Sequence, residues 1–188
     1  MRTYIALILI LAFNSSAGHA SASDDTLFSK YNISLDYGFT SEQRHSIASA
    51  IGHIPTCYRK NIVGMKLRNN TNLRWSDGHD CLPGHQISTV PPILELNASC
   101  GFTSELALHE IFHIVGNRGL QVKYQISFKT FPNCPVSSYS AWYQGRSLSE
   151  DFAEASRLVS TKHVTSDRRQ PCVTAKLQAL KIVMDQCE

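Results

Sequence analysis

A His-Glu-x-x-His pattern at residues 109–113 constrains this chain more than any other feature of its sequence. The pattern lies in a stretch that predicts an α-helix, and residues four apart lie on the same face of an α-helix. His109 and His113 can therefore direct two imidazoles at one point. Glu110 follows about 100° around the axis, near enough to touch a water molecule that a metal ion holds there. The pattern predicts a zinc site carried by a helix.

The rest of this helix supports the prediction. Its apolar residues recur at the i, i+3, i+4, i+7 spacing of a buried stripe: Leu108, Ile111, Phe112 and Val115. Thr103 or Ser104 can serve as the N-cap, and Gly116 stands where a helix commonly ends. The alternative is that both histidines are ordinary polar residues facing solvent. An apolar stripe on the other side of the helix favours the metal site.

A catalytic zinc ion needs three protein ligands and an open position for water. In one large class of zinc proteases the third ligand is a histidine that follows as His-x-x-Gly-x-x-His. Gly116 fits the glycine of that pattern, but residue 119 is also glycine, which disfavours this class.

A later helix offers glutamates instead. Glu150 and Glu154 are four residues apart, so both carboxylates face one way. The apolar residues between and after them face inward: Phe152, Ala155 and Leu158. One carboxylate can bind the metal, while the other accepts a hydrogen bond from the far nitrogen of a ligating histidine. The alternative is a solvated acidic helix face.

The N-terminal half predicts short strands alternating with one helix. Strands are expected at residues 31–37 and 61–67, with a turn at residues 69–72. Between the strands, Thr40 to Gln43 form a capping box, which opens a helix that ends before Pro55.

Residues 86–97 predict one further strand, which Pro91 and Pro92 interrupt. Proline cannot donate to a sheet ladder, so we expect an edge strand, and an edge beside the zinc helix can accept an extended peptide. A bent surface loop explains the two prolines equally well.

The remaining segments are expected to be loops at residues 75–84 and 137–149, a connecting segment at 119–134, and helices at 149–161 and 172–187.

The N-terminus predicts a secretory signal peptide at residues 1–22. Arg2 gives the positive start, residues 4–13 form an apolar run too short to span a bilayer, and Ala20 to Ala22 form a good cleavage signal. We expect a secreted or periplasmic protein with a single domain at residues 23–188 and no membrane span in the mature chain. The formal charge of +3 falls to +2 without Arg2, which gives no reason to expect nucleic acid or membrane as a partner.

Six cysteines fit an oxidising compartment and up to three disulfides: Cys57, Cys81, Cys100, Cys134, Cys172 and Cys187. None forms a Cys-x-x-Cys pair, which argues against a cysteine zinc knuckle or a redox motif. The sequence does not choose among the 15 pairings that six cysteines permit. If residues 172–187 form one helix, Cys172 and Cys187 lie roughly 22 Å apart, but a disulfide needs Cα atoms within about 7 Å. Each should therefore pair elsewhere.

The two helices together resemble a known family. The resemblance rests on two stretches: His109-Glu110-Ile111-Phe112-His113, and Glu-Asp-Phe-Ala-Glu-Ala-Ser-Arg-Leu at residues 150–158. Together they are similar to the catalytic domain of anthrax lethal factor and to the secreted Pro-Pro endopeptidases built on that domain. The resemblance implies a zinc metallopeptidase of the gluzincin type, with Glu150 as third ligand and Tyr143, seven residues earlier, stabilising the oxyanion. It spans about residue 40 to the C-terminus, and the six cysteines are a departure that the family does not require.

The resemblance also implies an α+β, zincin-like fold. We expect a small N-terminal mixed sheet with a helix, then the active-site helix, then a mainly helical C-terminal part.

The expected protein is a secreted, monomeric, zinc-dependent metallopeptidase with one Zn²⁺ per chain and a protein or peptide substrate. His109, His113 and Glu150 would hold the metal, and Glu110 would act as general base for the zinc-activated water. Tyr143 would donate to the developing oxyanion.

Other roles and functions stay open. Glu154 would orient a ligating histidine, and Tyr139 is the alternative to Tyr143. A secreted binding module with an inactive or structural zinc site would need a fourth ligand, for which three further histidines are candidates: His79, His85 and His163. A disulfide-stapled inhibitor with a chance motif would bind no zinc. Pro-Pro preference belongs to one branch of the similar family and does not transfer with three zinc ligands.

Overall fold

The computed structural model describes residues 22–74, 81–138, 140, 147–162 and 170–187. The expected signal peptide therefore lies, apart from Ala22, outside the described residues, as do Tyr139 and Tyr143. Within the described ranges, no helix combines the length and the apolar character needed to cross a membrane.

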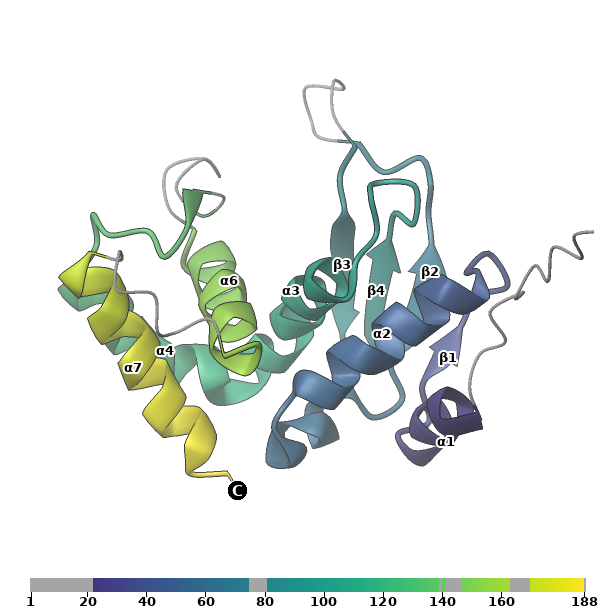
Figure 1. The fold of residues 1–188 in the computed structure, drawn as a ribbon, viewed down its shortest axis with the longest axis horizontal. Coiled ribbons are helices and arrows are strands. Elements are labelled where there is room, and N and C mark those ends of the chain that lie inside the picture. The colour runs from purple at the N-terminus through teal and green to yellow at the C-terminus, as the bar shows by residue number, and fades with distance from the viewer. Residues whose placement is uncertain (1–21, 75–80, 139, 141–146, 163–169, 188) are drawn as a thin grey trace, which may run out of the picture.

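A four-stranded mixed sheet, in the order β1-β2-β4-β3, forms the N-terminal half (Figure 1). Its strands are β1 (Ser34–Leu35), β2 (Lys66–Asn69), β3 (Gly84–Thr89) and β4 (Pro92–Leu96). The first three in this spatial order run parallel, and β3 runs antiparallel to β4. Leu94 and Leu96 of β4 are fully buried, as alternation along a strand with one face on the core requires. The expected α+β class and small mixed sheet are confirmed.

Helices cover this sheet and extend beyond it. They are α1 (Ala22–Lys30), α2 (Ser41–His53), η1 (Thr56–Ile62), α3 (Ser104–Val115), η2 (Gly116–Leu120), α4 (Gln121–Thr130), α6 (Leu148–Ser160) and α7 (Pro171–Asp185). Figure 1 shows α2 lying across one face of the sheet and a layer of α4, α6 and α7 on the other side of α3. Because α3 contacts α2, η1, β3, β4 and α6, it lies at the centre of the fold.

The predicted capping box opens α2. The Thr40 side chain accepts from the backbone N–H of Gln43, and the Gln43 side chain accepts from the backbone N–H of Thr40. Ile47 and Ile51, one turn apart, are fully buried. The helix ends at His53, two residues before the proline that was expected to stop it.

The strand predicted at residues 61–67 is wrong in its first half. Asn61 and Ile62 end the short helix η1, and β2 begins only at Lys66. Between them Gly64 has a φ of +75°, a left-handed conformation that reverses the chain and cannot belong to a strand.

The single strand predicted at residues 86–97 is two strands. Val90 and Pro91 lie at the turn of a hairpin, and Pro92 opens β4 opposite Thr89. The edge strands of the sheet are β1 and β3, whereas β4 lies inside it, between β2 and β3. The prolines therefore mark a reversal of the chain, since neither supplies a ladder N–H.

The segment expected as a connection after the motif helix is helical. The chain continues from α3 through η2 into α4. Apolar residues alternate in the sequence at Val122, Tyr124 and Ile126, but in the helix Tyr124 is buried while Val122 and Ile126 are exposed.

Three disulfides join segments that are distant in sequence: Cys57–Cys187, Cys81–Cys100 and Cys134–Cys172. The prediction that Cys172 and Cys187 pair elsewhere is confirmed, because Cys172 lies in the first turn of α7 and Cys187 follows its last residue. Three disulfides fit an oxidising environment.

Candidate metal centre

Two histidines on α3 and one glutamate on α6 converge in the middle of the molecule. The rings of His109 and His113 lie one turn apart, with centroids separated by 5.1 Å, and both residues are buried. Packing of α6 against α3 brings Glu150 to them, with its oxygens 3.2 Å from His109 Nε2 and 3.5 Å from His113 Nε2. One ligand atom from each residue lies within 4.8 Å of the others, so the three could hold a metal ion.

The far nitrogen of each histidine also has a polar neighbour. His109 Nδ1 lies 3.3 Å from Glu154 Oε2, and His113 Nδ1 lies 2.9 Å from Ser149 Oγ. These contacts hold both rings with Nε2 turned towards Glu150. Fixing the far nitrogen in this way is what metal-ligating histidines generally require.

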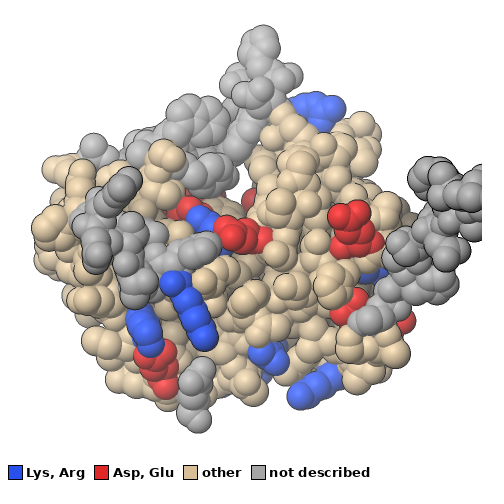
Figure 2. All heavy atoms as spheres, in the orientation of Figure 1, with Lys and Arg blue, Asp and Glu red and all other residues tan. Residues whose placement is uncertain are grey.

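Arg157 in turn fixes Glu154. Its guanidinium donates from Nε and Nη2 to the two Glu154 oxygens, at 3.0 and 2.8 Å, and from Nη1 to Glu105. Figure 2 shows acidic side chains on either side of a basic one where α6 meets α3. A chain of contacts thus runs from the surface through Arg157 and Glu154 to His109.

Burial and ionic contacts act in opposite directions on the pKa of His109. Burial lowers it, but hydrogen bonds to Glu150 and Glu154 raise it more, so the pKa of His109 rises to about 9. Burial likewise raises the pKa of Glu150, yet hydrogen bonds with His109 and His113 lower it to about 2. Without a metal, a proton on His109 therefore provides the positive charge that the carboxylates require.

Glu110 is buried next to this group but does not belong to it. Burial raises the pKa of its carboxyl group, although the charges of His109 and His113 act in the opposite direction. Gly84, the first residue of β3, lies directly against the Glu110 side chain. The start of the edge strand therefore determines where this carboxyl group can lie.

His109, His113 and Glu150 are called the candidate metal-binding group, and a hollow of about 250 Å³ opens beside it, on the His109 side. Pro83 and Leu106 give it apolar walls, and Glu105 and Arg157 lie on its lining with Glu154. The lining thus holds three glutamates, Glu105, Glu110 and Glu154, together with Arg157 and the His109 ring.

A buried ion pair ties α6 to α7 behind the metal-binding group. Asp151 is 2% exposed and accepts from Lys176 Nζ at 2.9 Å, from the Tyr124 hydroxyl at 2.8 Å and from the Val136 backbone N–H at 3.0 Å. Lys176 also donates to the Cys134 carbonyl oxygen at 2.6 Å. These bonds connect α4, α6, α7 and the segment before residue 139.

Sequence reasoning named the converging residues but missed several neighbours. Ser149 directly precedes Glu150, and Arg157 stands three residues after Glu154, a spacing at which helical side chains meet. That spacing could have identified the Glu154–Arg157 ion pair from the sequence. No local sequence signal connects Gly84 with Glu110. Among the fourth-ligand candidates, His85 lies exposed on β3 and outside the metal-binding group. His79 and His163 lie outside the described residues.

Comparisons with known proteins give no match. No family model, no curated protein and no solved structure matches this chain. Its function must therefore be inferred from the chemistry of the site itself.

Proposed function

We propose that this protein is a zinc-dependent metallopeptidase of the gluzincin type with a zincin-like fold. The observation that carries the proposal is the approach of His109 Nε2 and His113 Nε2 to Glu150, with Glu110 buried beside them. Three ligands with a separate acid group are what a hydrolytic zinc site contains.

The donor set supports zinc as the metal. Two imidazole nitrogens and one carboxylate are a known ligand set for catalytic zinc, and ligand atoms about 2.1 Å from a tetrahedral ion lie roughly 3.4 Å apart. The distances of 3.2 and 3.5 Å from Glu150 to the two histidines are close to that value. Neither histidine needs to rotate far, because Glu154 and Ser149 already fix the rings.

A bound zinc ion would lower the pKa of a water molecule and polarise a peptide carbonyl group. Glu110 would take the proton of that water and deliver it to the leaving amine. The raised pKa of Glu110 suits this role, because a carboxyl group that binds a proton more readily is a stronger base. Tyr143, placed by resemblance alone, would donate to the oxyanion.

The surroundings favour an extended peptide as substrate. β3 is an edge strand, which presents backbone groups for pairing, and its first residue contacts the proposed general base. The hollow on the His109 side would take a substrate side chain. Glu105, on the lining of this hollow, would contact a cationic side chain there.

The test is cleavage of a peptide library by the zinc-loaded protein, with and without a chelator. Glu110→Gln should retain one zinc ion per chain and lose cleavage, because only the base is removed. Glu42→Gln, on an exposed position of α2, is the matched control and should cleave normally. Full cleavage by Glu110→Gln would end the proposal.

The same preparation separates the alternatives. Wild-type protein that holds zinc but cleaves no peptide would favour a binding module with a structural or inactive zinc site. Protein that holds no zinc would favour the disulfide-stapled inhibitor.

A further inference from the structure

A second cleft lies at the opposite end of α6 from Glu150. Its volume is about 410 Å³, within the range of small-molecule sites and larger than the hollow beside the metal-binding group. Ser160 on its wall follows Glu150 by ten residues, which is roughly 15 Å along a helix. The cleft shares no lining residue with the hollow beside His109.

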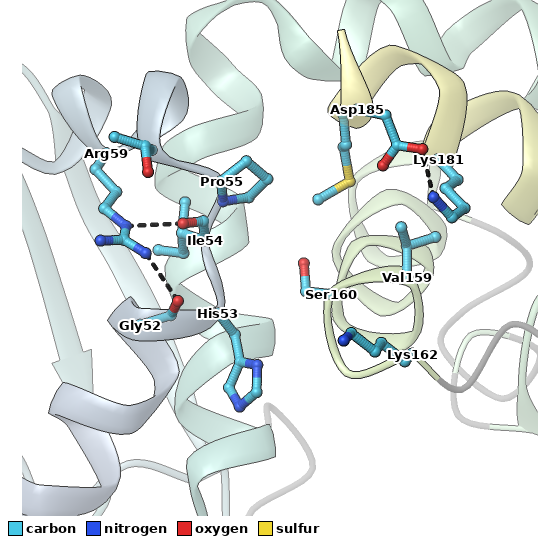
Figure 3. A pocket seen from close by; sticks show the side chains of 12 residues that line it. Gly52, His53, Ile54, Pro55, Arg59, Val159, Ser160, Lys162, Lys181 and Asp185 are labelled. Atoms are coloured by element: carbon cyan, nitrogen blue, oxygen red, sulfur yellow. Dashed lines mark hydrogen bonds and ion pairs between the residues drawn. The ribbon is translucent and has the colours of Figure 1, made fainter. Parts of the chain in front are cut away.

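The cleft lies where the two halves of the fold face each other (Figure 3). One wall is the end of α2 with the start of η1, and the other is formed by the ends of α6 and α7. Apolar side chains lie on both sides, with Pro55 on one wall and the largely buried Val159 and Met184 on the other. A molecule held there would be enclosed by hydrocarbon on two sides.

The charged groups around the cleft are mainly cationic. Arg59, Lys162 and Lys181 line it, against a single carboxylate, Asp185, among the described lining residues. Asp185 accepts from Lys181, so these two charges offset each other. The positive charges of Arg59 and Lys162 remain.

The negative end of α2 does not cancel this charge. Arg59 donates from Nε to the Ile54 carbonyl oxygen and from Nη2 to the Gly52 carbonyl oxygen, both at 2.8 Å. These bonds satisfy the carbonyl groups that would otherwise repel an anion.

Lys162 is the cation placed to receive a ligand. It is exposed and has no ion-pair partner among the described residues, and Figure 3 shows its side chain at the mouth between the two walls. Ser160 also lines the cleft, with a buried hydroxyl oxygen that lacks a hydrogen-bond partner among the described residues. An acceptor in the cleft would satisfy this hydroxyl group, whose isolation is otherwise costly.

The two walls are covalently connected. Cys57 lies in η1 on one side, and its partner Cys187 follows α7 on the other. A covalent connection limits the relative motion of the two walls, so less freedom is lost when a ligand enters, which favours binding.

From these features we infer that this cleft binds a small aliphatic carboxylate, with its hydrocarbon body between the apolar walls and its carboxylate at Lys162. A peptide fits less well, because Arg59 already occupies the carbonyl groups of Gly52 and Ile54 that could pair with peptide N–H groups. The inference does not depend on peptide hydrolysis.

The test is titration of the folded, disulfide-bonded protein with octanoate, followed by calorimetry and by amide chemical shifts. Octan-1-ol and octylammonium are the matched probes without charge and with the opposite charge. Octanoate should shift amide signals around Gly52 and Ser160 and should bind roughly tenfold or more tightly than octan-1-ol, as an added charged hydrogen bond predicts.

Two variants separate this site from the metal centre, which could also bind a carboxylate. Lys162→Glu should weaken octanoate binding by roughly tenfold or more. Lys129→Glu makes the same charge change on an exposed position of α4 and should leave binding unchanged. Equal effects of the two variants, shifts confined to the surroundings of His109, or equal binding of octan-1-ol would each overturn the inference.

Discussion

The Glu110 side chain lies against the backbone of Gly84. A β-carbon on Gly84 would come within 2.6 Å of Glu110 Cδ and 2.7 Å of Oε2, closer than such atoms approach in proteins. Gly84 is therefore the residue that leaves room for the proposed general base. It also links the edge strand β3 to the motif helix α3.

This contact predicts that Gly84→Ala separates metal binding from cleavage. The added methyl group should displace the Glu110 carboxyl group while His109, His113 and Glu150 keep their positions. A displacement of about 1 Å can reduce the rate roughly 10²-fold, so kcat should fall by that order with zinc content unchanged. The control is Gly52→Ala, where a β-carbon meets nothing within 4 Å and cleavage should persist. Normal cleavage by Gly84→Ala would show that Glu110 tolerates displacement.

The two glutamates of α6 should differ in their effect on metal binding. Glu150→Ala removes a proposed ligand and should abolish stoichiometric zinc. Glu154→Gln removes only the charged partner of His109 Nδ1. It should weaken zinc binding roughly 10–100-fold, as the loss of such a partner typically does. Competition with a zinc-binding dye measures both. A larger loss in Glu154→Gln would mean that the ligand and its supporting residue are exchanged.

The role of Tyr143 can be tested even though it lies outside the described residues. Loss of one oxyanion donor typically lowers kcat roughly 10²–10³-fold. Tyr143→Phe should therefore lower kcat by that factor and leave KM little changed. Tyr139→Phe, four residues earlier in the sequence, is the control with the same chemical change. If the two variants exchange these results, Tyr139 is the donor.

The buried ion pair of α6 and α7 predicts a large stability effect. Asp151 is 2% exposed, so Lys176→Met removes the cationic partner of a buried carboxylate, and breaking such a pair typically costs about 3–5 kcal/mol. Adding Asp151→Asn should recover part of that loss, because the charge disappears with its partner. Urea unfolding of both single variants and the double variant measures this coupling. Strict additivity would show that the pair does not couple.

The metal-free protein should show a pH dependence set by the same contacts. The folded pKa of His109, about 9 against 6.5, stabilises the fold below pH 6.5, and this contribution is lost as the pH rises through 9. The folded pKa values of Glu150 and Glu154, about 2 against 4.5, add stability above pH 4.5, which is lost as the pH falls towards 2. These groups together give the highest Tm between pH 4.5 and 6.5.

Thermal unfolding of chelator-treated protein across this range measures the effect. Glu154→Gln should flatten both sides of the profile, because it removes a partner of His109. A wild-type Tm that stays constant between pH 6.5 and 9 would contradict the raised pKa of His109.

The converging residues could be predicted because their spacing is local. His109 and His113 are four residues apart on one helix, and so are Glu150 and Glu154 on another. The capping box of Thr40 is likewise local. Helical geometry alone places such side chains on one face, before any tertiary contact forms.

The contacts between distant segments had no such signal. Gly84 meets Glu110, and Asp151 meets Lys176, only after the chain has folded. Pro91 and Pro92 fitted both an edge strand and a bent surface loop, and the folded chain places them at a hairpin turn. Sequence periodicity therefore predicted the site residues that share one helix. It could not predict the contacts between distant segments that hold those residues in place.

The Cys57–Cys187 disulfide closes a covalent ring of chain that contains α3, α6 and α7. A single peptide bond cut anywhere inside this ring leaves both pieces attached to each other. Nicked and intact molecules therefore have the same mass apart from one added water, and they separate only after reduction. Self-digestion within the ring would remain invisible on a non-reducing gel, so the intactness of a preparation must be judged under reducing conditions.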